Sequence, residues 1–311
     1  MARYDSLPEG ALKSHYHLDA MNLGLFAKGL DLLPEFGYPA VQFGDWHTPQ
    51  ALWHKKTAAH NTVVVDGQDQ SGGPTECTLW SAGGPVQAVR ASSPAQIKGK
   101  TYERTVAMVE TSPADFYVID IFRVTGGAQH AKHTHTAFAT AVPFGVHLSP
   151  ASSSYDAGTL MRAFQVDPVP AANWGVDWKI EDRNGYLSPG REIHLRYTDL
   201  TRNTEASVAE SWTVENMTST REYWIPTVIS RRRATEGELT STFVTILEPY
   251  EGQPRVRAIT RQDQKGDSDV RLSIRLQDGS RDTLTSGPAG LRWERREATG
   301  EIVFSGAASG R

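Results

Sequence analysis

The sequence is poor in cysteine, because Cys77 is the single thiol among 311 residues. One cysteine cannot form a disulfide within the chain, and the paired cysteine spacings of zinc ribbons and redox motifs are missing. Any metal site in this chain must therefore use histidine and carboxylate ligands.

Long apolar runs and a strong charge bias are missing as well. No segment approaches the length of a transmembrane helix, and the opening MARYDSLPEGALK lacks the charged-then-apolar order of a signal peptide. Lys and Arg number 32 against 36 Asp and Glu, which gives a net charge of -4 with no basic block. We therefore expect no membrane span and no nucleic-acid partner, although a local cluster of Arg, Lys or His can still bind a polyanionic substrate.

Several catalytic signatures are also absent. The sequence has no GxSxG elbow, no glycine-rich phosphate loop after a strand and no HExxH motif. Glycoside hydrolysis needs a carboxylate pair, but no pair can be singled out among 36 acids. Hydrolase, nucleotide-binding and zincin functions are thus without positive support.

Alternating apolar and polar residues, rich in β-branched and aromatic types, recur along the chain. Examples are YERTVAMVETS, DFYVIDIFRVTGG, TSTFVTILEPY and VRLSIRLQDGS, separated by turn signals such as Asp66-Gly67 and Asn184-Gly185. We predict an all-β fold, a large antiparallel β-sandwich. Strands become shorter and more charged after Glu248-Pro249-Tyr250, which predicts one domain at 1–248 and a small C-terminal β module at 249–311.

The stretch from Leu25 to Leu33 has near-helical apolar spacing, so a short helix competes with a hairpin there. We favour a hairpin with strands at 22–27 and 30–33. Glycine in Lys28-Gly29 supplies a positive φ for the turn, and Pro34 ends the second strand.

Histidines give the sharpest chemical signal. His15 and His17 in SHYH are two residues apart, so on a strand they share a face, and His60 follows in TAAHNT. Zinc commonly takes a short-spaced pair of ligands plus a distant one, and an acid such as Asp19 or Glu35 could complete the set. An HxH pair also occurs by chance, so scattered polar residues remain the alternative.

Other polar clusters are interpreted as surface features. His130, His133 and His135 follow a Gly-Gly turn and alternate with other residues, which favours a solvent-facing strand. Residues 231–233 form an Arg-Arg-Arg run that could meet a polyanion, but a solvated turn is favoured. The segment SPASSSYDAGT at 149–159 is predicted as an exposed loop.

The order of these motifs resembles one family. SHYHLDAMNLGLFAKGLDLLPEFGYP, then WHKKTAAHNTVVVDGQDQ, YERTVAMVETSPADFYVIDIFRVTGG and TFVTILEPY are similar to the heparinase II/III-like polysaccharide lyases, which include the oligo-alginate lyases. The resemblance covers roughly Tyr4 to Tyr250 in order and spacing.

The resemblance implies cleavage of a uronic-acid glycan by β-elimination, in which the C5 proton is abstracted and the glycosidic oxygen leaves C4. The C5 proton is weakly acidic, so the substrate carboxylate must be neutralised while a Tyr or His moves the protons. The partner is then an acidic polysaccharide of heparin, heparan sulfate or alginate type.

Carried onto this chain, the resemblance makes His15 the catalytic histidine. It makes His17, Glu35 and His60 the ligands of a structural zinc ion. Of the aromatic side chains that could stack on a sugar, only those near this region are taken as substrate-binding candidates, namely Tyr16, Tyr38 and Trp46.

The chain departs from the family pattern in three ways. Tyr16 stands between the two histidines where the family has Gly, and Glu35 replaces the usual Asp. The family's α/α toroid, which supplies a Tyr acid/base and an Asn or His for the carboxylate, is absent, so an upstream toroid domain is expected.

The isolated chain is then predicted to be inactive, and a non-catalytic carbohydrate-binding or structural module is the alternative function. The family resemblance suggests a periplasmic or secreted location, with a cytoplasmic one also open.

Overall fold

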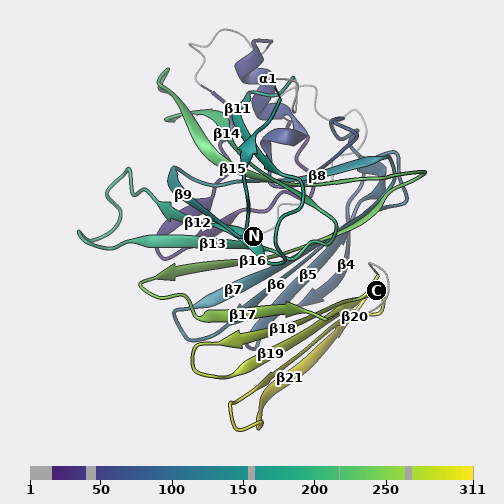
Figure 1. Cartoon of the computed structure of the whole chain (residues 1–311), viewed down its shortest axis with the longest axis vertical. Helices are drawn as coiled ribbons and strands as arrows, with labels where there is room; N and C mark the ends of the chain where they lie inside the picture. Colours follow the sequence, from purple (N-terminus) through teal and green to yellow (C-terminus); the bar gives the residue numbers. More distant parts are fainter. Residues whose placement is uncertain (1–15, 40–46, 153–157, 217, 263–267, 311) are drawn as a thin grey trace.

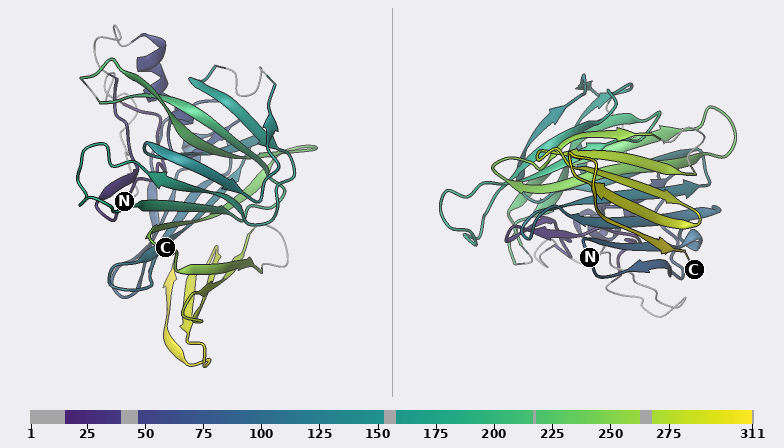
Figure 2. Two further views of the ribbon diagram at one scale, coloured as in Figure 1. Left: turned by 60° about the vertical axis from the view of Figure 1, so that its left-hand side comes forward. Right: turned by 90° about the horizontal axis from the view of Figure 1, so that it is seen from below.

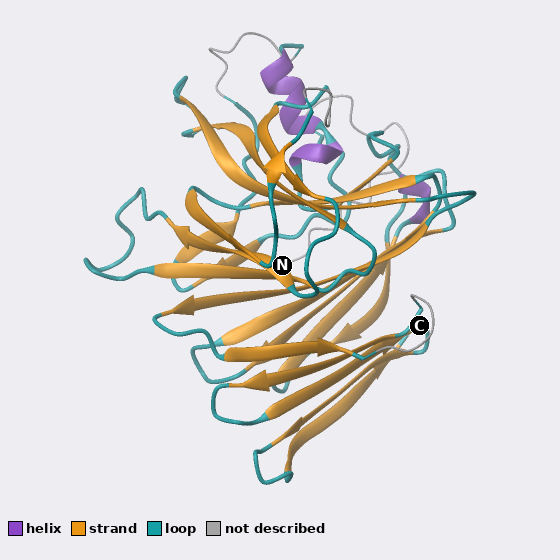
Figure 3. Ribbon diagram, in the orientation of Figure 1, coloured by secondary structure: helices purple, strands orange, loops and turns teal. Residues whose placement is uncertain are grey.

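The computed structural model describes residues 16–39, 47–152, 158–216, 218–262 and 268–310. Strands dominate these residues, and the single α-helix among them is short (Figure 3). The helical elements are α1 (Pro49–Lys55) and the 3-10 turns η2 (Thr57–Ala59) and η3 (Pro94–Gln96). The predicted all-β fold is confirmed.

Three antiparallel sheets stack as layers, with the largest in the middle (Figure 1). The eight-stranded middle sheet has the order β4 (Glu76–Ser81), β5 (Val86–Ser92), β6 (Thr101–Glu110), β7 (Phe116–Thr125), β16 (Thr240–Glu251), β13 (Ile193–Asp199), β12 (Trp174–Ile180), β9 (Ala139–Phe144). The six-stranded sheet has the order β10 (Ser149–Pro150), β11 (Met161–Asp167), β14 (Glu205–Val214), β15 (Glu222–Arg233), β8 (Gln129–His135), β3 (Val63–Val65). The five-stranded sheet runs in chain order through β17 (Val256–Arg261), β18 (Val270–Leu276), β19 (Arg281–Gly287), β20 (Gly290–Arg296), β21 (Ile302–Ser309).

The predicted hairpin near the N-terminus is confirmed as well. It consists of β1 (Leu25–Ala27) and β2 (Leu30–Leu33), and Lys28 and Gly29 turn between them with φ of 58° and 93°. Positive φ at both positions is the geometry of a tight hairpin turn. The first strand begins at Leu25 rather than at residue 22, because the preceding residues are engaged in the site described below.

The core between the six- and eight-stranded sheets follows the period-two alternation of their strands. Trp174, Val176 and Trp178 of β12 point into this layer, where they meet Val228 of β15 and Leu32 of the hairpin. The hairpin therefore closes one part of the sandwich core.

The opposite face of the eight-stranded sheet is apolar too, and the five-stranded sheet covers part of it. Ile119 and Ile121 of β7 share one core with Leu272 and Ile274 of β18. Figure 2 shows the five-stranded sheet as a separate layer at the end of the molecule. Strand β16 continues through residue 248 to Glu251, and the division into domains 1–248 and 249–311 stays a prediction.

A buried charge cluster links the two large sheets. Asp120 of β7 accepts two hydrogen bonds from Arg104 of β6, at 2.8 and 2.7 Å, and pairs with Lys132 of β8 at 2.6 Å. Burial alone would raise the pKa of the Asp120 carboxyl, but these two cations hold that pKa far below its ordinary value. The cluster is therefore a buried triad in which two cations share one carboxylate.

Two surface predictions are wrong. His130, His133 and His135 are 0%, 1% and 3% exposed, because β8 lies between β15 and β3 and is covered on both faces. Residues 231–233 are not a turn but the end of β15, and Arg231 is 4% exposed. In the predicted loop at 149–159, residues 149–150 form β10 and residues 153–157 lie outside the described part of the chain.

Among the described residues, none of the helices has the length and apolar character that crossing a bilayer would need.

Candidate metal centre

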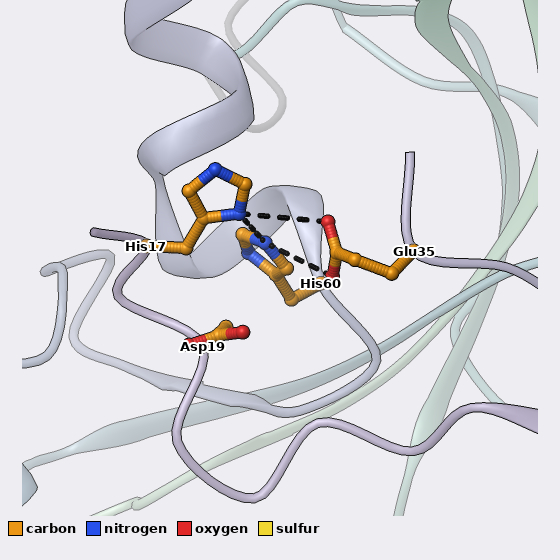
Figure 4. A group of neighbouring side chains, drawn as sticks. All are labelled: His17, Asp19, Glu35 and His60. Atoms are coloured by element: carbon orange, nitrogen blue, oxygen red, sulfur yellow. Dashed lines mark hydrogen bonds and ion pairs between the residues drawn. The ribbon is translucent and has the colours of Figure 1, made fainter. Parts of the chain in front are cut away.

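Four side chains with metal-binding atoms converge beside α1 and η2. They are His17, Asp19, Glu35 and His60, and one ligand atom from each lies within 4.8 Å of the others. Figure 4 shows His17, His60 and Glu35 pointing toward one another, with Asp19 on the same segment as His17. Segments far apart in the sequence thus build one site.

The spacing of three of these groups suits a common ion. His17 Nδ1 lies 3.1 Å from His60 Nε2, and the two Glu35 oxygens lie 3.5 Å from His17 Nδ1 and 3.5 Å from His60 Nε2. Tetrahedral ligands at about 2.0–2.1 Å from zinc stand roughly 3.3 Å from each other. The residues present therefore fit a zinc ion, with Asp19 available as a fourth ligand.

The tautomer of His60 favours ligation as well. Its Nδ1 lies 2.8 Å from the carbonyl oxygen of Lys56, which can only accept, so Nδ1 carries the proton. The lone pair of His60 then lies on Nε2, which faces His17 and Glu35. A backbone carbonyl that fixes the second nitrogen in this way is a common support for metal-binding histidines.

The electrostatics keep Glu35 ionised. Burial tends to raise the pKa of its carboxyl, but contacts with His17 and His60 and a bond from the Gly37 amide hold that pKa well below its usual range. Burial tends to lower the pKa of His60, and the neighbouring Glu35 carboxylate more than offsets this and raises it. The pocket is thus prepared for a positive charge, from a proton or from a cation.

Two asparagines hold the ligand segments together. Asn22 donates from Nδ2 to Glu35 Oε2 at 3.1 Å and accepts from the backbone N–H of Asn61 at 2.8 Å. Asn61 donates to the Leu23 carbonyl at 3.0 Å and accepts from the backbone N–H of His135 at 2.6 Å. Asn61 thereby ties the His17 segment and the His60 segment to strand β8.

Sequence reasoning missed this role of Asn61. The signal was the HNT triplet, because a buried Asn has both donors and acceptors to satisfy and so bridges backbone segments. Arg104 was missed in the same way: its guanidinium donates to the carbonyl oxygens of Met21 and Asn61, the latter at 2.5 Å.

A further histidine lies beside the cluster. His54 of α1 is 5% exposed and packs its ring edge-on against Trp212, with centroids 5.5 Å apart. Burial, followed by positive charge at His17 and His60, lowers the pKa of His54 to about 4. A small cleft lined by Glu35, His54 and His60 opens next to the candidate ligands.

The predicted site residues are placed as follows. His17, Glu35 and His60 come together, and the ring of Tyr38 packs edge-on against His17 with centroids 4.5 Å apart. Tyr16 is 42% exposed, near Lys55, whose Nζ lies 5.9 Å from its ring centroid. His15 and Trp46 lie outside the described residues, so their predicted catalytic and substrate-binding roles stay predictions.

Fold and site together define a β-sandwich protein of layered antiparallel sheets with a His/carboxylate cluster suited to a divalent metal. The chain belongs to the heparinase II/III-like C-terminal family, whose model matches residues 2–252. This confirms the family resemblance seen in the motifs. No curated protein sequence matches the chain.

Solved structures share the fold at low sequence identity. The heparan sulfate lyase HepC from Pedobacter heparinus is 17% identical with a TM-score of 0.59, over 91% of this chain and 38% of that chain. A heparinase III is 14% identical with a TM-score of 0.57, over 86% of this chain and 36% of that chain. The chain therefore spans less than two-fifths of the length of these relatives.

Proposed function

We propose that this chain is the β-sandwich part of a polysaccharide lyase that cleaves uronic-acid glycans by β-elimination. Membership of the heparinase II/III-like C-terminal family carries the proposal. The similar structures are a heparan sulfate lyase and a heparinase III, and we extend their substrate class to this chain. Heparin, heparan sulfate and alginate are the glycans to test.

Within this proposal, His17, Glu35 and His60 hold a structural zinc ion. When bound, zinc would supply a fixed point that cross-links the segments before β1, after β2 and before β3. The ligand spacing and the tautomer of His60 support this role. The Glu35 carboxyl is ionised before any metal binds, so metal binding does not require it to release a proton.

The elimination itself needs a base within reach of the C5 proton and a proton donor within reach of the oxygen on C4. The C5–H bond and the C4–O bond break, a C4–C5 double bond forms, the base takes the C5 proton and an acid returns a proton to the leaving oxygen. We assign His15, two residues before His17, to one of these proton transfers. The carboxylate-binding and remaining acid/base groups are assigned to an upstream α/α toroid, the expected partner domain.

Metal content tests the zinc assignment. Purified chain is expected to contain about one zinc ion per molecule by elemental analysis. His60→Ala should lose the metal, whereas the control His147→Ala, at a histidine outside the cluster, should retain it. Absence of metal from the wild-type chain, with folding unchanged by chelator, would overturn the assignment.

Product formation tests the reaction. The chain alone is expected to release little unsaturated product from heparan sulfate or alginate, measured by ultraviolet absorbance. Supplying the helical domain of a heparinase III, fused upstream, should restore elimination, and His15→Ala should abolish it. Affinity for the glycan that survives His15→Ala, with no product even in the fusion, would instead favour a non-catalytic binding module, in line with the exposed Tyr16.

A further inference from the structure

A second cavity opens at one end of the sandwich, and arginines surround it. Its volume is about 780 Å³, within the range of about 300–1,000 Å³ usual for small-molecule sites. Arg202 comes from the turn after β13, Arg231 and Arg233 from the end of β15, and Arg261 from the end of β17. Of the residues that the structure describes, none lines both this cavity and the cleft beside Glu35 and His60.

The charge of this cavity is strongly unbalanced. Among the described residues that line the cavity, Glu205 is the one acidic residue. The carboxylate of Glu205 is shared, since it accepts from Arg233 Nη1 at 2.9 Å and lies 3.6 Å from Arg231 Nη1. Four guanidinium groups and one carboxylate leave a formal excess of three positive charges, on a chain whose net charge is -4.

Hydrogen bonds between separate elements hold the walls of the cavity in place. Arg261 Nη1 donates to the carbonyl oxygen of Leu200 at 3.1 Å, which ties β17 to the turn that carries Arg202. Thr204 Oγ1 donates to the Arg231 carbonyl at 3.2 Å, and Asn173 Nδ2 donates to the Ile259 carbonyl at 2.8 Å. The arginines are thus presented by a scaffold that is braced before any ligand arrives.

The rim adds an apolar surface. Val169 is 82% exposed there and stands between Pro168 and Pro170. The C–H face of a pyranose ring can rest on such a surface while its charged substituents meet the arginines. Guanidinium groups match the planar carboxylate and the oxygens of a sulfate with paired, charge-assisted hydrogen bonds.

We propose that this cavity is a second glycan-binding site, which holds the sulfate or carboxylate groups of an acidic oligosaccharide away from the metal centre. The identity of the ligand rests on the proposed lyase function, while the anion-binding chemistry rests on the four arginines. Such a site keeps a long polyanionic chain attached between cleavage events and raises its local concentration.

Calorimetric titration of the full chain with a heparin-derived tetrasaccharide tests the proposal. The exposed pair is changed in the double variant Arg202→Gln/Arg233→Gln, which leaves the buried Arg231 and the metal centre untouched. We expect affinity to fall by about tenfold and its dependence on salt to become shallower. The matched control Arg275→Gln/Arg281→Gln removes two exposed charges on the five-stranded sheet, outside the cavity lining, and should bind like wild type.

Two further titrations identify the anion. Binding of an unsulfated uronate tetrasaccharide that is weakened by the same double variant supports the site and extends it to carboxylates. Equal binding by the double variant and its control would overturn the proposal, as would inorganic phosphate binding as tightly as the tetrasaccharide. Failure of the lyase assignment would appear separately, in the metal and product assays, which do not involve these arginines.

Discussion

Glu248 of β16 is a buried acid whose two oxygens lie in different surroundings. Oε1 accepts from the backbone N–H groups of Arg255 and Val256, at 2.5 and 2.8 Å. Oε2 is buried and has no hydrogen-bond partner among the described residues. Burial outweighs the two amide bonds and raises the pKa of Glu248 to about 7.

This shift predicts a pH dependence of stability. Between pH 4.5, the ordinary value, and about 7 the folded chain holds a proton at Glu248 that the unfolded chain releases. Stability from this group is therefore present at low pH and is lost as pH rises through about 7, by about 2–3 kcal/mol between about pH 5 and about pH 8. The free energy of unfolding should be measured with urea at both pH values. Wild type should lose stability between the lower and the higher pH, and Glu248→Gln, which has no carboxyl to ionise, should lose less.

The control for this prediction is Glu236→Gln, since Glu236 is exposed. Its unfolding free energy should follow that of wild type at both pH values. An equal pH dependence in Glu248→Gln and wild type would show that Glu248 is already ionised at acidic pH in the folded chain.

At the residue scale, the sequence was informative where a family motif existed and misleading where polarity was taken for exposure. His17, Glu35 and His60 were predicted as neighbours from motif order, and the structure brings them together. The β8 histidines were predicted to face solvent because polar residues usually do, yet His133 and His135 are buried. Burial is the main cause that lowers the pKa of each of these histidines to about 3. Burying a neutral imidazole costs much less free energy than burying a charged one, and the sequence does not reveal which form is present.

At the scale of elements, β6 supports the candidate metal centre from behind. The Arg104 guanidinium contacts Asp120 and also the carbonyl oxygens of Met21 and Asn61, which flank the ligands. Arg104→Met removes one member of a buried charge cluster and two carbonyl partners. We expect a loss of about 3–5 kcal/mol in the free energy of unfolding, measured with urea, together with weaker zinc retention.

Arg275→Met provides the comparison for this change, because Arg275 is an exposed arginine on β18. Its stability should stay close to wild type. A stable Arg104→Met variant that keeps its metal would show that the Asn22–Asn61 contacts are sufficient to hold the site.

The elements themselves were predicted unevenly. The β1–β2 hairpin followed from Lys28-Gly29, because a tight turn is a local property. The pairing of β15 with β8 and of β16 with β7 joins segments roughly a hundred residues apart, and local patterns do not specify such partners. Prediction of the site from sequence is limited in the same way, since residues such as Asn61 and Arg104 reach their partners only once the sheets are paired.

For the whole molecule, the shared core between β7 and β18 predicts a single unfolding transition. Removing the five-stranded sheet would expose Ile119 and Ile121 of the eight-stranded sheet. Each of these two sheets therefore needs the other to keep its apolar face out of water. Differential scanning calorimetry should give a van't Hoff enthalpy close to the calorimetric one. Two separated transitions would instead support an independent module at 249–311.

Metal removal is the second test at this scale. If zinc joins three segments, chelation should lower the midpoint of thermal unfolding, and a thousandfold excess of free zinc over Kd stabilises by about 4 kcal/mol. His60→Ala should be insensitive to the chelator. A wild-type midpoint that does not change on chelation would remove the structural role of the ion.

The central position of β16 has a consequence for how the chain is made. β16 pairs with β7 on one side and β13 on the other, yet it is the last strand of its sheet in chain order. During synthesis the open hydrogen-bonding edges of β7 and β13 must wait until residues 240–251 leave the ribosome. Stalling or truncation before that point would leave two unpaired edges in the nascent chain, the condition under which chaperone binding or edge-to-edge aggregation is expected.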